Sequence, residues 1–279
     1  MSHPKKSKYN NFANDLHADC ENCFGLCCVA LPYAKSADFA FDKNGGIPCP
    51  NLQSDYRCKI HRDLRNKGFR GCVVYECFGA GQKVSQVTFK GNDWREHPNL
   101  SDEMFKVFPI VQQLHEMLYY LNQALQLDRA QSIFQKIQAA YEQTEHLTYQ
   151  SPHSILELDI SLHRAQINNL LLQTSKLVRA KVPNRSKKKL GRGMDLIGAN
   201  LRGANLRGVN FRGALLIAAD LTGADMRLTD LIGADLRDAN LSGVNLTGSI
   251  FLTQAQLNAA KGNRNTKLPD HLRIPDHWL

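Results

Sequence analysis

The 279-residue sequence predicts a mixed, multidomain fold with three structured parts. These are a small cysteine-rich domain, an α-helical bundle, and a short solenoid of five-residue repeats closed by a C-terminal cap helix. Three observations support this prediction. All eight cysteines lie between Cys20 and Cys77, amphipathic helical patterns follow residue 101, and a strict five-residue period begins at Met194.

Changes in composition along the chain set the predicted boundaries. They are a flexible basic N-terminus (1–19), a cysteine-rich domain (20–100), a helical bundle (101–182), a basic linker (183–193), the repeats (194–253), and a cap and tail (254–279). Most of the formal charge of +9 comes from lysines and arginines in the N-terminus and the linker. We therefore expect solvated basic segments and no nucleic-acid partner, with a polyanion-binding patch as the alternative.

No stretch of the sequence approaches the roughly 18 apolar residues that cross a bilayer. The basic N-terminus lacks the apolar core of a signal peptide. We therefore expect a cytoplasmic protein without membrane contact. In such a reducing compartment, cysteines are more often metal ligands or reactive thiols than disulfide partners.

The cysteine spacing predicts a metal-binding domain. The pattern C-x2-C-x3-C-C comes first, and four further cysteines follow at loop positions. The predicted metal ligands are Cys20, Cys23, Cys27, Cys28, Cys49, Cys58, Cys72 and Cys77. Four thiolates suit both zinc and a [4Fe–4S] cluster, so either zinc or iron is the expected cofactor. The eight thiols can supply two four-coordinate sites, or one site plus buried cysteines.

The segments CENCFGLCC, CPNLQSDYRCKIH and RGC resemble the zinc- or iron-chelating cysteine-cluster family of bacteria. The resemblance covers about 60 residues and implies metal binding without specifying the metal. The sequence departs from the family pattern in two places. Three residues separate Cys23 from Cys27 where two are common, and His61 stands where the family often has tyrosine. His61 is either an additional ligand or an ordinary surface histidine.

Three apolar stripes predict the helical bundle. The first runs from Met104 to Leu125, with Pro109 marking a kink or a fresh start. The second covers residues 130–141 and the third residues 154–181. Each stripe needs the others for burial, so a small antiparallel bundle is expected.

From Met194 the chain can be written as twelve units of five residues. The third position holds Leu, Phe or Met, the second mostly Asp or Asn, and the fifth mostly Gly. A chain that turns about 90° at every unit returns to the same face after four units. The third and first positions then point inward, while the Asp or Asn bonds backbone at each corner, where Gly relaxes the conformation.

These units resemble the pentapeptide-repeat family, whose members fold as right-handed quadrilateral β-helices. The resemblance covers residues 194–253 and implies three coils. Thr253 and Gln256 match a helix capping box, so a short helix is expected to close the carboxyl end. We expect Trp278 to anchor the tail.

The fourth position of each unit is expected to point outward. One face then stacks Ile197, Ile217 and Arg237, and another stacks Arg212, Ile232 and Leu252. Stacked exposed isoleucines indicate a covered surface. We expect either packing against the protein's own helices or a protein partner, including a second copy in a homodimer.

The functional prediction is a metal-binding scaffold or interaction protein with a structural or sensory metal site. No catalytic residue can be assigned, because the sequence has no phosphate loop, dinucleotide fingerprint or H-E-x-x-H motif. One alternative is an iron–sulfur enzyme or modification factor. Another comes from the resemblance: some pentapeptide-repeat proteins mimic DNA and modulate DNA gyrase. The repeats carry six Asp against five Arg, which is a poor match to an acidic rod.

Overall fold

The computed structural model describes residues 16–180, 182 and 193–279. It divides into two compact units, residues 1–171 and 172–279. Residues 1–15 of the predicted N-terminus and 183–192 of the predicted linker lie outside the described residues. The final part of that N-terminus is packed, because Leu16 is buried and Asp19 caps the first short helix.

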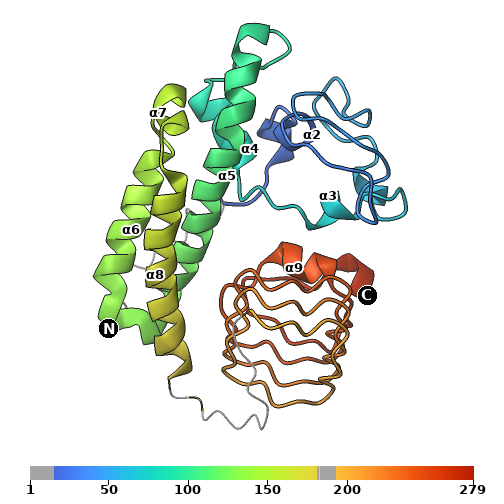
Figure 1. Cartoon of the computed structure of the whole chain (residues 1–279), viewed down its shortest axis with the longest axis vertical. Coiled ribbons are helices and arrows are strands. Elements are labelled where there is room, and N and C mark those ends of the chain that lie inside the picture. The colour runs from blue at the N-terminus through green and yellow to red at the C-terminus, as the bar shows by residue number, and fades with distance from the viewer. Residues whose placement is uncertain (1–15, 181, 183–192) are drawn as a thin grey trace. The chain divides into compact units, whose positions relative to one another are not determined.

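The cysteine-rich region consists of short helices joined by loops (Figure 1). Its elements are η1 (Cys20–Asn22), α2 (Leu26–Val29), η2 (His61–Asp63), α3 (Arg70–Val74), α4 (Ala80–Gln82) and the π-helix η3 (Lys83–Thr88). This region shares one hydrophobic core with the long helix that follows, which contributes Met104, Val107 and Phe108 beside Leu26 and Val29. The boundary predicted between residues 100 and 101 therefore runs through a shared core.

Helix α5 (Pro98–Gln126) is one continuous helix that begins at a proline and passes through Pro109. Proline suits the first turn of a helix, where its missing N–H has no partner to bond. The predicted fresh start at Pro109 is wrong, because the residues before it already form the helix and bury Met104 and Val107. The predicted spacing of three to four residues along the buried face is confirmed.

The remaining helices of the bundle are η4 (Asp128–Ile133), α6 (Phe134–Leu147), α7 (Pro152–Leu156) and α8 (Ile160–Arg179). Helix α8 packs beside α5 and α6, since Arg164 pairs with Glu116 at 3.2 Å and His163 contacts Thr144 at 2.9 Å (Figure 1). The third predicted helix is two helices. Asp159 interrupts it by accepting a hydrogen bond from the backbone N–H of Leu162, as an N-cap does.

In the repeats, parallel bridges join residues twenty apart, from Asp195 with Leu215 to Asp230 with Ile250. Each unit is tied to the next coil by backbone bonds: the Leu201 N–H donates to the Asp220 carbonyl (2.8 Å), and the Asp220 N–H to the Ala199 carbonyl (2.9 Å). The predicted four-unit coil is therefore confirmed (Figure 1). Among the described residues the bridges are isolated, so the regular strands of a β-helix are not found, and the predicted right hand stays a prediction.

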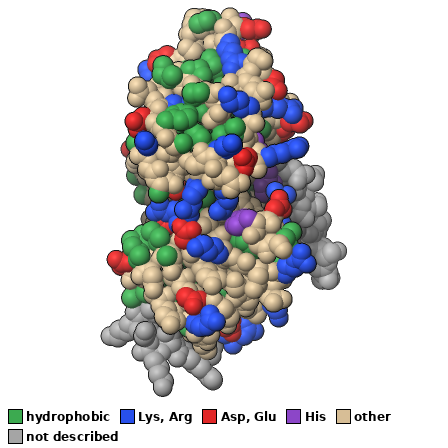
Figure 2. All heavy atoms as spheres, turned by 90° about the vertical axis from the view of Figure 1, so that its right-hand side faces the viewer, with side chains coloured by type: hydrophobic (Ala, Val, Ile, Leu, Met, Phe, Trp, Pro, Cys, Tyr) green, Lys and Arg blue, Asp and Glu red, His purple; other side chains and the backbone are tan. Residues whose placement is uncertain are grey.

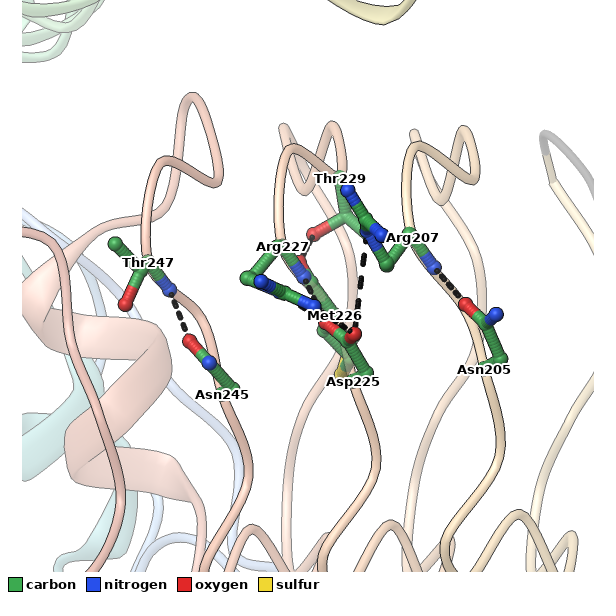
Figure 3. Close-up of polar contacts among 8 residues, drawn as sticks. All are labelled: Asn205, Arg207, Asp225, Met226, Arg227, Thr229, Asn245 and Thr247. Carbon is green, nitrogen blue, oxygen red and sulfur yellow. Dashed lines mark hydrogen bonds and ion pairs between the residues drawn. The ribbon is translucent and has the colours of Figure 1, made fainter. Parts of the chain in front are cut away.

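The first and third positions of the repeats fill the interior of the coil. Leu221, Phe211, Leu216 and Leu241 are fully buried. The second position bonds the backbone N–H two residues ahead. On one face these bonds, at 3.3, 3.2 and 3.1 Å, join Asn205 to Arg207, Asp225 to Arg227 and Asn245 to Thr247 (Figure 3). Both inward burial and corner bonding were predicted correctly.

The fifth position turns the corner with a positive φ, at Gly198 (+63°) as at the other glycines of the repeats. Where glycine is absent, Ala218, Leu228 and Asp238 adopt the same region, with φ of 55–57°. The twelfth unit departs from the pattern. Phe251 at its third position has a φ of +60°, and Leu252, expected outside, is fully buried.

Helix α9 (Gln254–Ala259) closes the carboxyl end with the predicted capping box. The Gln256 N–H donates to the Thr253 hydroxyl (3.2 Å), and the Thr253 N–H donates to the Gln256 side chain (2.8 Å). The helix ends at Ala259. Lys261 and Lys267 then bridge to Asn240 and Asn245, so the tail adds two rungs to the coil.

Trp278, in η5 (Asp276–Trp278), anchors the tail as predicted. Its ring is buried, and its indole N–H donates to the Ala260 carbonyl at 3.1 Å. Gly262 is needed beneath this ring, because a β-carbon there would lie 2.5 Å from it.

Candidate functional site

All eight predicted ligand cysteines lie in the first unit as free thiols. Cys49 is buried, Cys20 and Cys72 are exposed, and the other five cysteines are partly buried. Hydrophobic side chains, a class that here includes cysteine, gather over this region on the face drawn in Figure 2, with Lys and Arg side chains at their edges. Cys28, in α2, acts electrostatically on Cys20 and Cys23 as well as on Cys58 and Cys72.

The first thiol group consists of Cys20, Cys23, Cys27 and Cys77. Three of its members, Cys23, Cys27 and Cys77, pack against the core that α5 shares with the cysteine-rich region. The Cys23 sulfur occupies a space that Gly81 leaves open, 2.7 Å from where a β-carbon of residue 81 would lie. Burial raises the pKa of Cys77 to about 11, with Glu76 and Cys23 adding to the rise. The pKa of Tyr75 is also raised, first by burial and then by Cys27 and Cys77.

The second thiol group consists of Cys28, Cys49, Cys58 and Cys72. The Cys49 backbone N–H donates to the Cys28 carbonyl at 2.9 Å, and the Tyr33 hydroxyl lies 3.4 Å from the Cys49 sulfur. Packing around Cys72 raises the pKa of its thiol to about 12, mainly by desolvation and then by the thiols of Cys28, Cys49 and Cys58.

An aromatic cluster supports this second group. Tyr33 stacks on Phe39 with ring centres 4.3 Å apart, and Phe41 and Phe69 complete the cluster. The Cys72 N–H donates to the Phe69 carbonyl at 3.1 Å. These contacts tie the loop around Cys49 to helix α3.

Cys27 and Cys28 are adjacent in α2, and their thiols form a hydrogen bond. Cys27 is the donor, which raises the pKa of its own thiol. The same bond lowers the pKa of Cys28, and the ammonium of Lys43 lowers it further. Cys28 is therefore the thiol of this pair that ionises more readily.

Lys43 is a buried cation beside the thiols. Its ammonium donates to the carbonyls of Val29 (3.0 Å), Asn44 (3.1 Å) and Ile47 (3.0 Å). Burial lowers its pKa, while Cys49, Cys28 and Cys27 act in the opposite direction. The sequence carries no signal for this residue, because only the folded loop brings it to the cysteines.

In the part of the chain that the structure describes, no three Cys, His, Asp or Glu side chains lie close enough together to hold a metal ion. The predicted ligands are thus gathered in one region without coordination geometry. His61 is exposed, and its backbone N–H donates to the Cys58 carbonyl at 3.2 Å.

A cavity of about 290 Å³ is lined by residues of η1, α4, η3, α5 and α6. Its lining includes Asp19, Lys83, His115, Glu145 and Tyr149. The Lys83 ammonium lies 2.9 Å from the centre of the Tyr149 ring. The His115 Nδ1 lies 2.8 Å from the Phe78 carbonyl, and burial lowers the pKa of this histidine to about 4. The sequence carries no signal for this cavity, because its wall combines five separate elements.

The outward faces of the repeats carry paired charges. Arg202 pairs with Asp220 (3.3 Å), Arg237 with Asp235 (2.7 Å) and Arg212 with the fully buried Asp230 (3.2 Å). The face predicted from Arg212, Ile232 and Leu252 is largely buried. Apolar exposure remains on the other face, where Ile197 is 53% and Leu215 is 39% exposed.

None of the helices in the described ranges combines the length and the apolar character needed to cross a membrane.

Comparison with known proteins places these features in a family. The family model for pentapeptide repeats matches eight copies, over residues 195–231 and 214–251. Over 271 residues, the chain is 62% identical to "Uncharacterized protein YybG" of Bacillus subtilis (strain 168), covering 97% of both chains.

Two solved pentapeptide repeat proteins are also similar. One is from the cyanobacterium Cyanothece 51142 (31% identity, 27% of this chain and 54% of that chain, TM-score 0.22). The other is from the Arabidopsis thaliana thylakoid lumen (29% identity, 30% of this chain and 58% of that chain, TM-score 0.22). The chain thus spans a little over half of each of these two structures. Because its repeats match the family model and it covers 97% of a relative that is 62% identical, the chain belongs to the pentapeptide-repeat family and is a relative of YybG.

Proposed function

We propose that this protein binds zinc or iron through the thiolates of its cysteine-rich region, and that its repeat coil docks a protein partner. The observation that carries the metal proposal is the gathering of eight reduced cysteines, from five separate segments, around α2. Hydrophobic packing alone does not require eight cysteines in so small a region. Thiolates are the ligands that zinc and iron–sulfur clusters prefer.

Two features of the site fit a metal–thiolate group. Lys43 places a buried positive charge beside Cys27, Cys28 and Cys49, which suits a centre of net negative charge. Gly81 provides open space at the Cys23 sulfur that any larger residue would fill. Most of the thiols have raised pKa values, so their sulfurs would lose protons as the metal binds.

When bound, the metal would supply structural bonds between the loops that carry the cysteines. The chain's own residues would then hold the ligands in place: α2 carries Cys27 and Cys28, and the Tyr33 hydroxyl contacts Cys49. No residue of the region is assigned a catalytic role. A structural or metal-sensing site is therefore the favoured reading.

Metal analysis of protein purified without oxygen or chelator tests this proposal. We expect at least one equivalent of zinc or iron per chain, and an absorption band near 400 nm if the metal is an iron–sulfur cluster. Chelation should lower the melting temperature of the first unit far more than that of the repeats. Metal-free protein that retains full stability and reduced thiols would contradict the proposal.

The repeat coil supports the second part of the proposal through an apolar strip made of the exposed Ile197 and Leu215 and the half-buried Ile217. Ile197 and Ile217 are stacked in successive coils, since the Gly198 N–H donates to the Ile217 carbonyl at 2.8 Å. Such a strip on an otherwise charged surface favours contact with another protein. The paired arginines and aspartates argue against the acidic surface that DNA mimicry requires.

The variant Ile217→Arg tests the strip. At an interface, the charge should abolish the complex or the homodimer while leaving the melting temperature nearly unchanged. Thr247→Arg is the matched control, since Thr247 is exposed on a different face of the coil. Unaltered sedimentation and pull-down for Ile217→Arg would contradict a docking role for this strip.

A further inference from the structure

We propose that the cavity lined by η1, α4, η3, α5 and α6 binds a free α-amino acid with an apolar side chain. The ammonium group of the ligand donates to His115, its carboxylate pairs with Lys83, and its side chain lies against the apolar part of the wall. Among the lining residues of this cavity in the described chain there is no cysteine. The inference is therefore independent of the proposed metal binding.

His115 carries the hydrogen-bond acceptor of this site. Its Nδ1 lies 2.8 Å from the Phe78 carbonyl, and a carbonyl oxygen only accepts, so Nδ1 carries the proton. Burial lowers the pKa of His115 to about 4, so the ring is neutral at neutral pH and its Nε2 is an acceptor. Among the described residues, Nε2 has no hydrogen-bond partner.

This acceptor opens onto the cavity. His115 lines the cavity although the residue is only 5% exposed, and its Nε2 is not one of the fully enclosed polar atoms that lack a partner. Leu118, three residues further along α5 and on the same side of the helix, lines the cavity as well. Buried polar groups are nearly always hydrogen-bonded, so a ligand with an N–H group would complete the bonding of His115.

The charged residues of the wall favour a ligand that carries both signs of charge. Asp19, Lys83 and Glu145 line the cavity. Two carboxylates against one ammonium favour a positively charged donor over a neutral hydroxyl group at His115. Lys83 is the one basic residue of the described lining besides the neutral histidine, and its field lowers the pKa of His115 further. A small molecule with an ammonium and a carboxylate group can therefore meet His115 and Lys83 together.

The remaining wall is largely apolar. Val87 and Tyr149 line the cavity and are 45% and 60% exposed, so its open side is apolar and unusually accessible. The Lys83 ammonium lies 2.9 Å from the centre of the Tyr149 ring, which holds the cation at this side. Leu16 and Leu118 are buried and line the interior. An apolar ligand side chain would cover this surface.

Hydrogen bonds hold the wall in place. The Gln82 side chain donates to the His17 carbonyl at 2.7 Å and accepts the Asp19 N–H at 3.2 Å, and the Gln86 side chain donates to the Asn22 carbonyl at 3.0 Å. These bonds tie η1 to the π-helix η3, and π-helical turns occur frequently at functional sites. The volume of about 290 Å³ is at the lower end of ligand pockets, roughly 300–1,000 Å³, which suits a single amino acid.

Calorimetric titration of the full chain with each of the standard L-amino acids tests the proposal. We expect at least one amino acid with an apolar side chain to bind, at one equivalent per chain. Wild-type protein that binds none of them would overturn the proposal. Binding restricted to amino acids with charged side chains would overturn the assignment of the apolar wall.

Two analogues of the amino acid that binds test its two anchors. One is the amine that lacks the carboxylate, and the other is the carboxylic acid that lacks the ammonium group. Each should bind at least about tenfold more weakly, because each has lost one charge-assisted contact. An analogue that binds as tightly as the amino acid would overturn the anchor that it lacks.

His115→Asn tests the acceptor. The asparagine amide can still donate to the Phe78 carbonyl, but it places no acceptor where Nε2 lies. We expect the affinity for the amino acid to fall at least about tenfold, and the analogue without the ammonium group to bind the variant and the wild type alike. His61→Asn, at an exposed histidine, is the matched control and should bind normally. Wild-type affinity in a folded His115→Asn, verified by circular dichroism, would overturn the role of His115.

Lys83→Met provides a second, independent variant. It removes the charge and keeps an unbranched side chain against the Tyr149 ring. The affinity for the amino acid should fall at least about tenfold, whereas the amine without a carboxylate should bind the variant and the wild type equally. Lys136→Met, at an exposed lysine of α6, should alter neither affinity. Equal weakening of the amino acid and the amine by Lys83→Met would overturn the pairing of Lys83 with the carboxylate.

Discussion

Arg212 and Asp230 form a buried ion pair across two coils of the repeats. The guanidinium nitrogen lies 3.2 Å from the carboxylate, and the two side chains are only 6% and 0% exposed. Asp230 also accepts the backbone N–H of Ile232 at 3.1 Å, so its carboxylate is bonded on both sides. The corresponding pair two faces away, Arg202 with Asp220, is exposed.

Because Arg212 is buried and Arg202 is exposed, replacing each with alanine should lower the unfolding free energy by different amounts. Arg212→Ala should lower the unfolding free energy by about 3–5 kcal/mol, because it leaves a buried carboxylate without its counter-charge. Arg202→Ala should cost no more than about 1 kcal/mol, since its pair is solvated. Urea denaturation followed by circular dichroism compares the two. Similar costs would mean that Arg212 is not buried in solution.

Leu221→Asp tests the five-residue register. The Leu221 side chain is fully buried, with 0% of its surface exposed to water. A carboxylate at this position would therefore have no partner. The variant should lose the coil entirely, and its thermal transition for the repeats should disappear. Ile197→Asp, at an exposed position of the first coil, is the control and should melt normally. A stable Leu221→Asp coil would show that the register is wrong.

The corners of the coil offer a stabilising change. Ala218 has a φ of +55°, which costs a residue with a β-carbon about 1 kcal/mol or more. Ala218→Gly should therefore raise the unfolding free energy by about 0.5–1 kcal/mol, net of the greater freedom of glycine in the unfolded chain. Gly198 occupies the same corner one coil earlier, with no atom within 4 Å of an added β-carbon. Gly198→Ala should lower stability by a similar amount, and changes of the opposite sign would contradict the corner argument.

His115 predicts a pH dependence of the first unit. Burial lowers the folded-state pKa of this residue to about 4, from an ordinary value of 6.5, so the folded form keeps the ring neutral. The contribution of the neutral, buried His115 ring to the unfolding free energy is fully present above pH 6.5. It is lost progressively as pH falls to 4, by up to about 3 kcal/mol, because protons bind the unfolded chain first.

His115→Asn should remove most of that acid sensitivity, because its amide N–H can still donate to the Phe78 carbonyl. Denaturation curves of both proteins at pH 7 and pH 4.5 provide the measurement. His61→Asn, at an exposed histidine, should retain the wild-type pH dependence. If His115→Asn and the wild type lose the same unfolding free energy between pH 7 and pH 4.5, His115 is not the buried, neutral group that causes the acid sensitivity.

The sequence alone determined the architecture of residues 194–253 and the cap that follows. The second and third positions of the repeat meet similar surroundings in successive coils, so the burial of Leu221 and the corner bond of Asp225 follow from a local rule. The capping box of Thr253 and Gln256 is equally local. Where the pattern weakens, in the twelfth unit, the prediction for Leu252 failed.

Only the tertiary structure decided how the cysteine-rich region is arranged. The spacing identified all eight thiols, but which of them become neighbours depends on interactions between residues far apart in sequence, such as Cys77 with Cys23 and Cys72 with Cys49. Lys43 and the cavity around His115 had no sequence signal for the same reason. A periodic chain repeats one short-range environment, whereas a loop-rich core is built from long-range contacts that each occur once.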